Sequence, residues 1–244
     1  MGLPTDVMRL YELAYCCRAY AALDSYDAAT VALREATGDC VDPDDPTHLG
    51  PLFVWLRKWG CRQFVIEDEN LSRESLTAWW EDWRDEVPPN DRTLDMLGDE
   101  ALDSIAAAYE DLRTCQASWQ RKQTGTFRWN FGPAGAAKAL YAIRPNACSP
   151  WDDPIRTRLQ LPETGDGYRR HLLSSRTELA EAVAELGPDA DASELPVLVN
   201  RPQSSPVKLV DEHDWARYTR GFEPPAPAEL ARWAEWAQAE TEHD

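Results

Sequence analysis

A stretch of small residues at positions 131–159 constrains the fold more than any other part of the sequence. It begins FGPAGAAKALYAIRP, in which Gly132 and Pro133 suit the first turn of a helix and Pro145 ends it. The glycine and alanine side chains allow another backbone or a ligand to come close. After a short loop, Asp152 and Asp153 precede a second helix, where backbone N–H groups point outward. The stretch therefore predicts a closely packed helix, a loop and a carboxylate pair at the next helix.

The same stretch resembles the helix-hairpin-helix superfamily of DNA glycosylases. Members of that family carry a glycine-containing hairpin, a small-residue helix and then an Asp in the pattern Pro-x-x-Asp-x-x-Val/Ile. Here Gly132 lies twenty residues before Asp152, and Pro150, Asp152 and Ile155 form a version of the pattern that is one residue shorter. Relatives that also cut the DNA backbone carry a Lys eighteen residues before the Asp, where this chain has Ala134.

The resemblance implies a hydrolase that flips a base out of double-stranded DNA and breaks its N-glycosidic bond. Asp152 would be the catalytic carboxylate, and the methyl group of Ala134 implies a monofunctional enzyme that leaves an abasic site. Lys138, one turn further along the helix, is either a catalytic amine, a phosphate contact or a surface side chain. Asp153 suits a helix N-cap because Pro154 follows it. Capping is also the structural alternative for Asp152.

The resemblance implies a monomer that needs no cofactor beyond a monovalent cation at the hairpin. The DNA-binding candidates are small or cationic residues: Gly132, Gly135, Arg128, Arg156, Arg158 and Arg169. The candidates for stacking on a base are the aromatic residues Phe127, Trp129 and Trp151. The excised base is not specified, so repair of damaged DNA and defence against modified phage DNA both fit. Two alternatives stay open: a catalytically inactive module that binds DNA or protein, and a helical scaffold.

Charge is distributed unevenly along the chain. The formal net charge is −18, which disfavours nucleic acid as a partner because phosphate contacts require cations. Residues 120–176, however, hold ten Lys or Arg against four Asp or Glu, whereas the remainder holds fifteen against thirty-nine. The sign of the balance changes where the motif lies. We therefore expect a local basic surface whose binding to DNA is steeply salt-dependent.

Apolar residues recur at helical spacing through most of the chain, as in Leu76, Trp79, Trp80 and Trp83. No segment shows a convincing strand pattern. Residues 116–130 are basic and aromatic, and they are interpreted either as a segment that stacks on or wedges into nucleic acid or as a surface loop with two buried aromatic residues. The predicted fold is all-α: a two-lobed helical bundle with a helix-hairpin-helix element. It forms a single domain over 1–244, with lobes at 1–118 plus the C-terminal helices and at 119–187. A last helix is expected at 229–240.

The six cysteines form no CxxC pair and no cluster with histidine, which argues against a zinc or iron–sulfur site. Adjacent Cys16 and Cys17 are expected to be small buried residues. Free thiols predict a reducing cytoplasmic location. No signal peptide and no apolar run long enough to span a membrane are expected.

Overall fold

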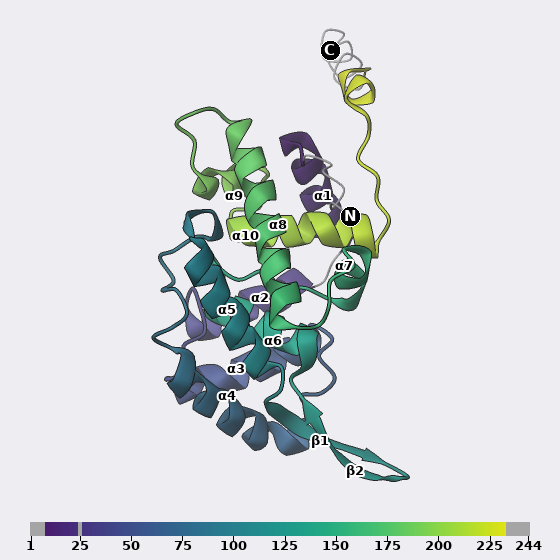
Figure 1. Ribbon diagram of the computed structural model, residues 1–244. Helices are drawn as coiled ribbons and strands as arrows, with labels where there is room; N and C mark the ends of the chain where they lie inside the picture. Colours follow the sequence, from purple (N-terminus) through teal and green to yellow (C-terminus); the bar gives the residue numbers. More distant parts are fainter. Residues whose placement is uncertain (1–7, 24–25, 233–244) are drawn as a thin grey trace.

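The computed structural model describes residues 8–23 and 26–232 (Figure 1). Its α-helices, within those residues, confirm the prediction of a largely helical fold. They are α1 (Leu10–Leu23), α2 (Tyr26–Thr37), α3 (Pro46–Lys58), α4 (Glu69–Trp83), α5 (Asp99–Leu112), α6 (Gly132–Ile143), α7 (Asp153–Arg158), α8 (Gly165–Ala184), α9 (Leu195–Leu198) and α10 (Pro206–Asp214). A π-helical turn, Trp215–Thr219, continues α10. Residues 227–232 are helical, and the rest of the helix expected at 229–240 lies outside the described residues.

The prediction of a fold without strands is wrong at residues 116–130. They form an antiparallel hairpin of β1 (Gln116–Lys122) and β2 (Gly125–Asn130), which projects from the helical body (Figure 1). Strand β1 lies against α4, where Ser72 Oγ donates to the Ala117 carbonyl oxygen at 2.5 Å. Only the base of the hairpin is buried. The sequence of the two strands therefore lacks the alternation of apolar and polar residues that indicates a strand with one buried face.

The hairpin also changes the element that the family resemblance predicts. Helices α5 and α6 are joined by the two strands of the β-hairpin, whereas the resemblance predicts a glycine-containing hairpin. At the end of β2, the Phe131 amide donates to the Cys115 carbonyl oxygen at 2.9 Å. The Gly132 amide donates to the Arg113 carbonyl oxygen at 3.0 Å. Gly132 has φ of +67°, a conformation that glycine adopts without steric cost, and α6 begins there.

Helix α6 is packed on most of its circumference, as its small side chains predicted. Ala136, Ala137 and Ala139 are fully buried. A Cβ atom at Gly135 would lie 2.3 Å from Gln63 Nε2 and 3.3 Å from the Phe64 ring. The glycine is therefore explained by close approach of the segment that follows α3.

The remaining core is built largely from aromatic rings. Tyr109 of α5 stacks on Tyr168 of α8 with ring centroids 4.3 Å apart, and Trp151 meets both rings edge-on. Trp79 and Trp80 of α4 are buried, which confirms the core role predicted for the tryptophan stripe. The loop before α7 is therefore attached to the body through Trp151, and this attachment fixes the position of the carboxylates that follow.

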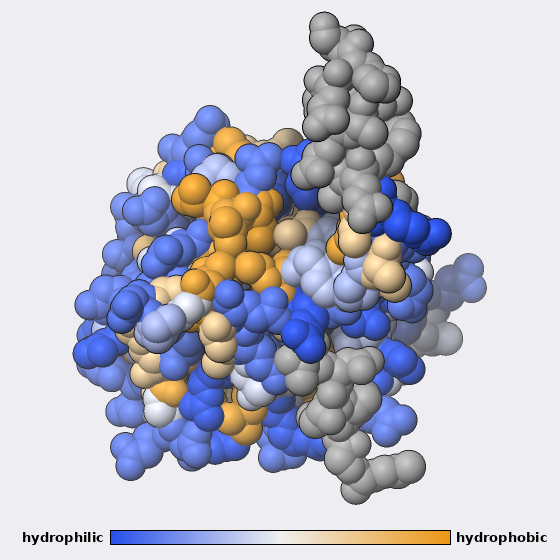
Figure 2. All heavy atoms as spheres, turned by 90° about the horizontal axis from the view of Figure 1, so that it is seen from above, coloured by the Kyte–Doolittle hydropathy of each residue, from blue (hydrophilic) through white to orange (hydrophobic). Residues whose placement is uncertain are grey.

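The surface is mostly hydrophilic, with an apolar area on the face seen from above in Figure 2. Cys16 and Cys17 are buried, as predicted. Within the described residues, none of the helices combines the length and the apolar character required to cross a bilayer.

Candidate functional site

A cavity of about 400 Å³ lies where α1, α6, the loop before α7, α10 and the π-helical turn meet. Its lining combines aromatic rings with charged groups: Tyr20, Leu23, Trp59, Lys138, Trp151, Asp152, Asp211, Trp215, Thr219 and Arg220. The cavity thus brings together three residues singled out from the sequence, Lys138, Trp151 and Asp152. Its other walls come from α1, from Trp59 after α3, and from α10 with the turn that follows it.

Asp152 is the N-cap of α7. Its backbone is extended and its Oδ1 accepts a hydrogen bond from the Ile155 amide at 3.2 Å. The prediction that Asp153 caps α7 is therefore wrong, because Asp152 is the cap. Asp153 is the first helical residue, its side chain is 78% exposed, and it pairs with Arg156 at 3.3 Å. Pro154 at the second helical position accounts for the difference, because proline is tolerated throughout the first turn.

The Asp152 carboxylate lies in surroundings that shift its affinity for protons. Burial raises its pKa above the ordinary value for Asp, and the hydrogen bond from Ile155 opposes that shift. The negative charge of Asp211 raises the pKa further, and the positive charge of Lys138 lowers it. A buried carboxylate with a raised pKa is a stronger base than an exposed one.

Lys138 faces the cavity and is held in place by the end of α3. Its Nζ donates to the Trp59 carbonyl oxygen at 2.8 Å and lies 5.6 Å from the centroid of the Trp59 ring. The carbonyl is one of those left unpaired at a helix C-terminus, where a cation is favoured. Lys138 is therefore half-buried with its ammonium anchored, and its role as a catalytic amine, a phosphate contact or a snorkelling surface side chain stays a prediction.

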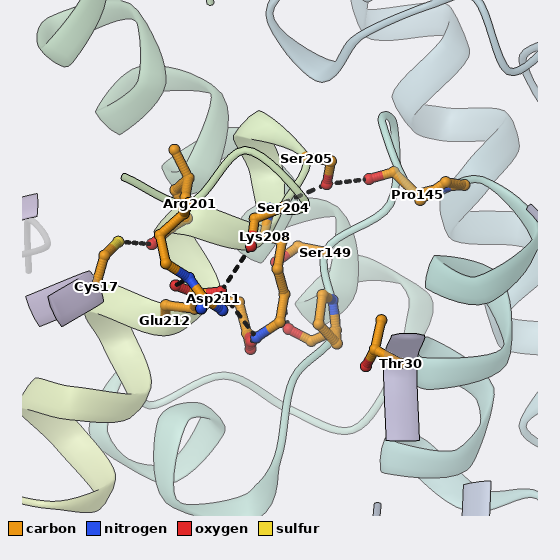
Figure 3. A network of polar contacts seen from close by, with 12 residues as sticks. Cys17, Thr30, Pro145, Ser149, Arg201, Ser204, Ser205, Lys208, Asp211 and Glu212 are labelled. Carbon is orange, nitrogen blue, oxygen red and sulfur yellow. Dashed lines mark hydrogen bonds and ion pairs between the residues drawn. The ribbon is translucent and has the colours of Figure 1, made fainter. Parts of the chain in front are cut away.

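Asp211 is a second carboxylate in the lining, and it belongs to a buried network on α10 (Figure 3). Its Oδ2 accepts from Lys208 Nζ, which lies 4.0 Å from Glu212 Oε1. Arg201 in turn donates two hydrogen bonds to Glu212, at 2.8 and 3.0 Å. Two cations and two anions thus balance one another. Burial disfavours the charged form of Lys208, but the combined effect of Asp211, Tyr20, Glu212 and Tyr141 outweighs it, and the Lys208 pKa is raised.

Aromatic rings form the walls on either side of these charges. Tyr20 and Trp215 meet edge-to-face with centroids 5.1 Å apart, and Lys208 Nζ lies 4.3 Å from the Tyr20 centroid. Trp151 stacks on buried His171 at 5.4 Å and donates its indole N–H to the Pro133 carbonyl oxygen at 3.3 Å. A flat, electron-rich lining of this kind suits a planar or cationic ligand.

The other two stacking candidates lie on the β-hairpin, outside the cavity lining. Phe127 is 48% exposed and Trp129 is half-buried. Their backbone partners are Gln120 and Ser118, so both rings stand on the same face of the hairpin. The structure therefore separates the three aromatic candidates, one in the cavity and two on the projecting hairpin.

The predicted DNA-binding arginines mostly have partners within the chain. Arg128 donates to the Thr114 carbonyl oxygen at 2.8 Å and to Asn130. Arg156 forms ion pairs with Asp153 and Glu163, and Arg169 forms one with Asp103. Arg158 lies over the Tyr218 ring. Gly132 and Gly135 have the backbone and packing roles described above. Their contact with DNA stays a prediction.

Sequence reasoning missed the lining residues that lie far from the motif. Trp59 is the C-cap of α3. Asp211, Trp215 and Arg220 received no functional interpretation. A usable signal was the spacing of Lys208, three residues before Asp211 and four before Glu212, on a helix with an apolar face.

Comparisons of the chain with protein-family models, with curated proteins and with solved structures found no match. The chemistry of the cavity is therefore inferred from its own residues.

Proposed function

We propose that the chain is a monofunctional DNA glycosylase that hydrolyses the N-glycosidic bond of a flipped-out base. The observation that carries this proposal is the position of Asp152, the carboxylate at a helix start inside an aromatic cavity. Its neighbours Lys138 and Trp151, identified from the same stretch of sequence, line that cavity too. The volume of about 400 Å³ lies within the range of small-molecule sites and suits a single nucleobase.

The proposed reaction requires an anion beside a sugar that becomes cationic. The electron pair of the bond between C1′ and the base nitrogen leaves with the base, which takes a proton from solvent. A water molecule adds its oxygen to C1′ and gives a proton to Asp152. The raised pKa of Asp152 favours that transfer. Trp59, Trp215 and Tyr20 would hold the extruded base by stacking.

The proposal includes an intact DNA strand as the product. Ala134 offers no amine, and the Lys138 ammonium is engaged by the Trp59 carbonyl at 2.8 Å. A nucleophile has to come within roughly 3–3.5 Å of the reacting carbon with its lone pair available. Lys138 then acts as a positive charge near the substrate phosphate or the departing base.

The β-hairpin supports DNA as the partner. Residues 116–130 contain three cations and no acidic residue, in a chain with a net charge of −18. Phe127 and Trp119 are exposed on opposite faces of the hairpin. A projecting ribbon with exposed aromatic rings and few negative charges suits a DNA groove. We place the activity on cytoplasmic DNA, for which the six free cysteines fit a reducing compartment.

The test compares Asp152→Asn with Asp153→Asn in single-turnover reactions that count abasic sites. Asparagine caps a helix about as well as aspartate, so Asp152→Asn keeps α7 and removes the charge. We expect it to lower base release by at least about a hundredfold, as loss of a positioned acid–base group does. Asp153→Asn is the matched control, because its exposed carboxylate lies outside the lining.

The substrate panel should hold genomic and phage DNA, with and without modified bases. Base release that Asp152→Asn abolishes supports a glycosylase. DNA binding without base release on any substrate would instead support the inactive binding module. If neither variant changes the rate of release, Asp152 is not the catalytic residue and the proposal fails.

A further inference from the structure

A second cluster of polar side chains lies behind the cavity wall, at the end of α10. Glu178 of α8 faces His213 and Asp214, and one oxygen or nitrogen of each lies within 4.8 Å of the others. His213 and Asp214 are 3% and 2% exposed. None of the three lines the cavity, and the proposed reaction does not use them.

The hydrogen bonds in this cluster leave a buried carboxylate oxygen without a partner. Glu178 Oε1 accepts from Ser174 Oγ at 3.0 Å, and Glu178 Oε2 is buried without a hydrogen-bond partner. Such an atom is costly to bury unless something binds it. His213 Nδ1 lies 3.3 Å from Asp214 Oδ1, a separation that suits two donor atoms on one ion. When Nδ1 binds the ion, the proton of the neutral His213 ring lies on Nε2.

The cluster also lacks a protein cation, unlike the other buried acids on α10. Glu212 pairs with Arg201, and Asp211 pairs with Lys208. Within the described residues, neither Glu178 nor Asp214 forms an ion pair with a Lys or Arg. A divalent cation would neutralise two carboxylates without any rearrangement of the chain's own charges.

We infer that Glu178, His213 and Asp214 form a metal site for a first-row transition dication of the zinc class. One imidazole nitrogen with two carboxylates is a mixed donor set that favours such ions over Mg²⁺, which binds mainly through oxygen and water. His213 Nδ1 and Asp214 Oδ1, 3.3 Å apart, would both bind the ion. For a tetrahedral ion with bonds of about 2.1 Å, the donor atoms must close to roughly 3.4 Å.

The site would connect α8 to the wall of the cavity. Asp214 is the last residue of α10, and Trp215 of the following π-helical turn lines the cavity. Turns of this type are frequent at functional sites and cost helical hydrogen bonds. A bound ion would hold this junction in place, so metal loading should stabilise the whole fold.

The test uses the full chain, stripped with a chelator and then titrated with Zn²⁺, Co²⁺ or Mg²⁺. We expect one equivalent of Zn²⁺ or Co²⁺ and a rise in Tm of about 5–10 °C at a hundredfold excess over Kd. Mg²⁺ should leave the Tm unchanged. Glu178→Gln and His213→Gln should each weaken Co²⁺ binding at least about tenfold, whereas exposed Glu81→Gln should not.

Metal-free Glu178→Gln separates a lost ligand from a damaged fold. Because it removes a buried acid that has no cationic partner, it should melt no lower than the metal-free wild type while failing to respond to Zn²⁺. Absence of stoichiometric binding to the wild type would overturn the inference. So would binding that survives both substitutions, or a Co²⁺ spectrum with thiolate charge-transfer bands, since either places the ion elsewhere.

Discussion

Replacement of Lys208 by methionine tests whether the buried network of α10 holds the cavity together. Lys208 is 3% exposed, and its ammonium is shared between Asp211 and Glu212. Loss of one partner of a buried ion pair costs about 3–5 kcal/mol because the other charge is left uncompensated. Here Glu212 still pairs with Arg201, and Asp211 borders the cavity. We therefore expect the free energy of unfolding to fall by about 3 kcal/mol, the lower end of that range.

The methionine side chain keeps the packing of the lysine stem and offers a sulfur contact to the Tyr20 ring, so the measured loss reports the charge. In a chain of 244 residues, 3 kcal/mol corresponds to a fall in Tm of about 6–12 °C. The assay is urea unfolding followed by fluorescence, with the slope m unchanged. Arg121→Met is the control, because it breaks an exposed pair with Asp68, which solvent screens, and should lower the stability far less than Lys208→Met.

The double variant Lys208→Met/Asp211→Asn measures the coupling between the two charges. If the pair is the source of the loss, the double variant should be more stable than the sum of the single effects predicts. A loss below about 1 kcal/mol in Lys208→Met, or a loss that Asp211→Asn leaves unchanged, would refute this account of the network.

Three further predictions concern pH, packing and the reaction product. Burial lowers the pKa of His171 to about 4, whereas His171 in the unfolded chain takes up a proton near pH 6.5. The free energy of unfolding should therefore be highest above pH 6.5 and should fall as the pH is lowered through that value. Urea unfolding should show that the free energy of unfolding falls by about 2 kcal/mol from pH 7 to pH 5, and that this contribution is absent in His171→Gln. Gly167→Ala places a methyl group 1.9 Å from the Pro162 carbonyl oxygen and should cost about 3 kcal/mol or more, whereas Gly98→Ala, with nothing within 4 Å, serves as the thermal-unfolding control. Borohydride added during turnover should trap no protein–DNA adduct; an adduct that disappears in Lys138→Ala would show that Lys138 is the nucleophile.

The helices were predictable because each buries one face at a period of 3.6 residues. Leu76, Trp79 and Trp80 are an example, and all three are buried. The β-hairpin was not predictable in this way. Its strands are stabilised mainly by pairing with each other, and burial is confined to Ala117 and Ser118 at the base. Without a buried face, the sequence of a strand shows no period of two residues.

The candidate site was predictable only where it is local in sequence. Asp152 and Lys138 belong to one motif of small residues and a helix start, and both line the cavity. Asp211, Trp215 and Arg220 reach the same cavity through the packing of the π-helical turn on α1 and α7, which no local pattern encodes. The N-cap was assigned to Asp153 because proline is common at the first helical position, which would make the preceding residue the cap. Pro154 instead occupies the second helical position, so Asp152 is the cap.

The charged groups in the cavity lining balance one another within an acidic chain. Two carboxylates, Asp152 and Asp211, are matched there by two cations, Lys138 and Arg220. The lining is therefore formally neutral although the whole chain carries −18. One oxygen of Asp152 accepts a hydrogen bond from the Ile155 amide at the start of α7, where partial positive charge favours an anion. Under the proposed function, this carboxylate would remain available beside a developing cation while Lys138 and Arg220 attract the phosphates on either side of it.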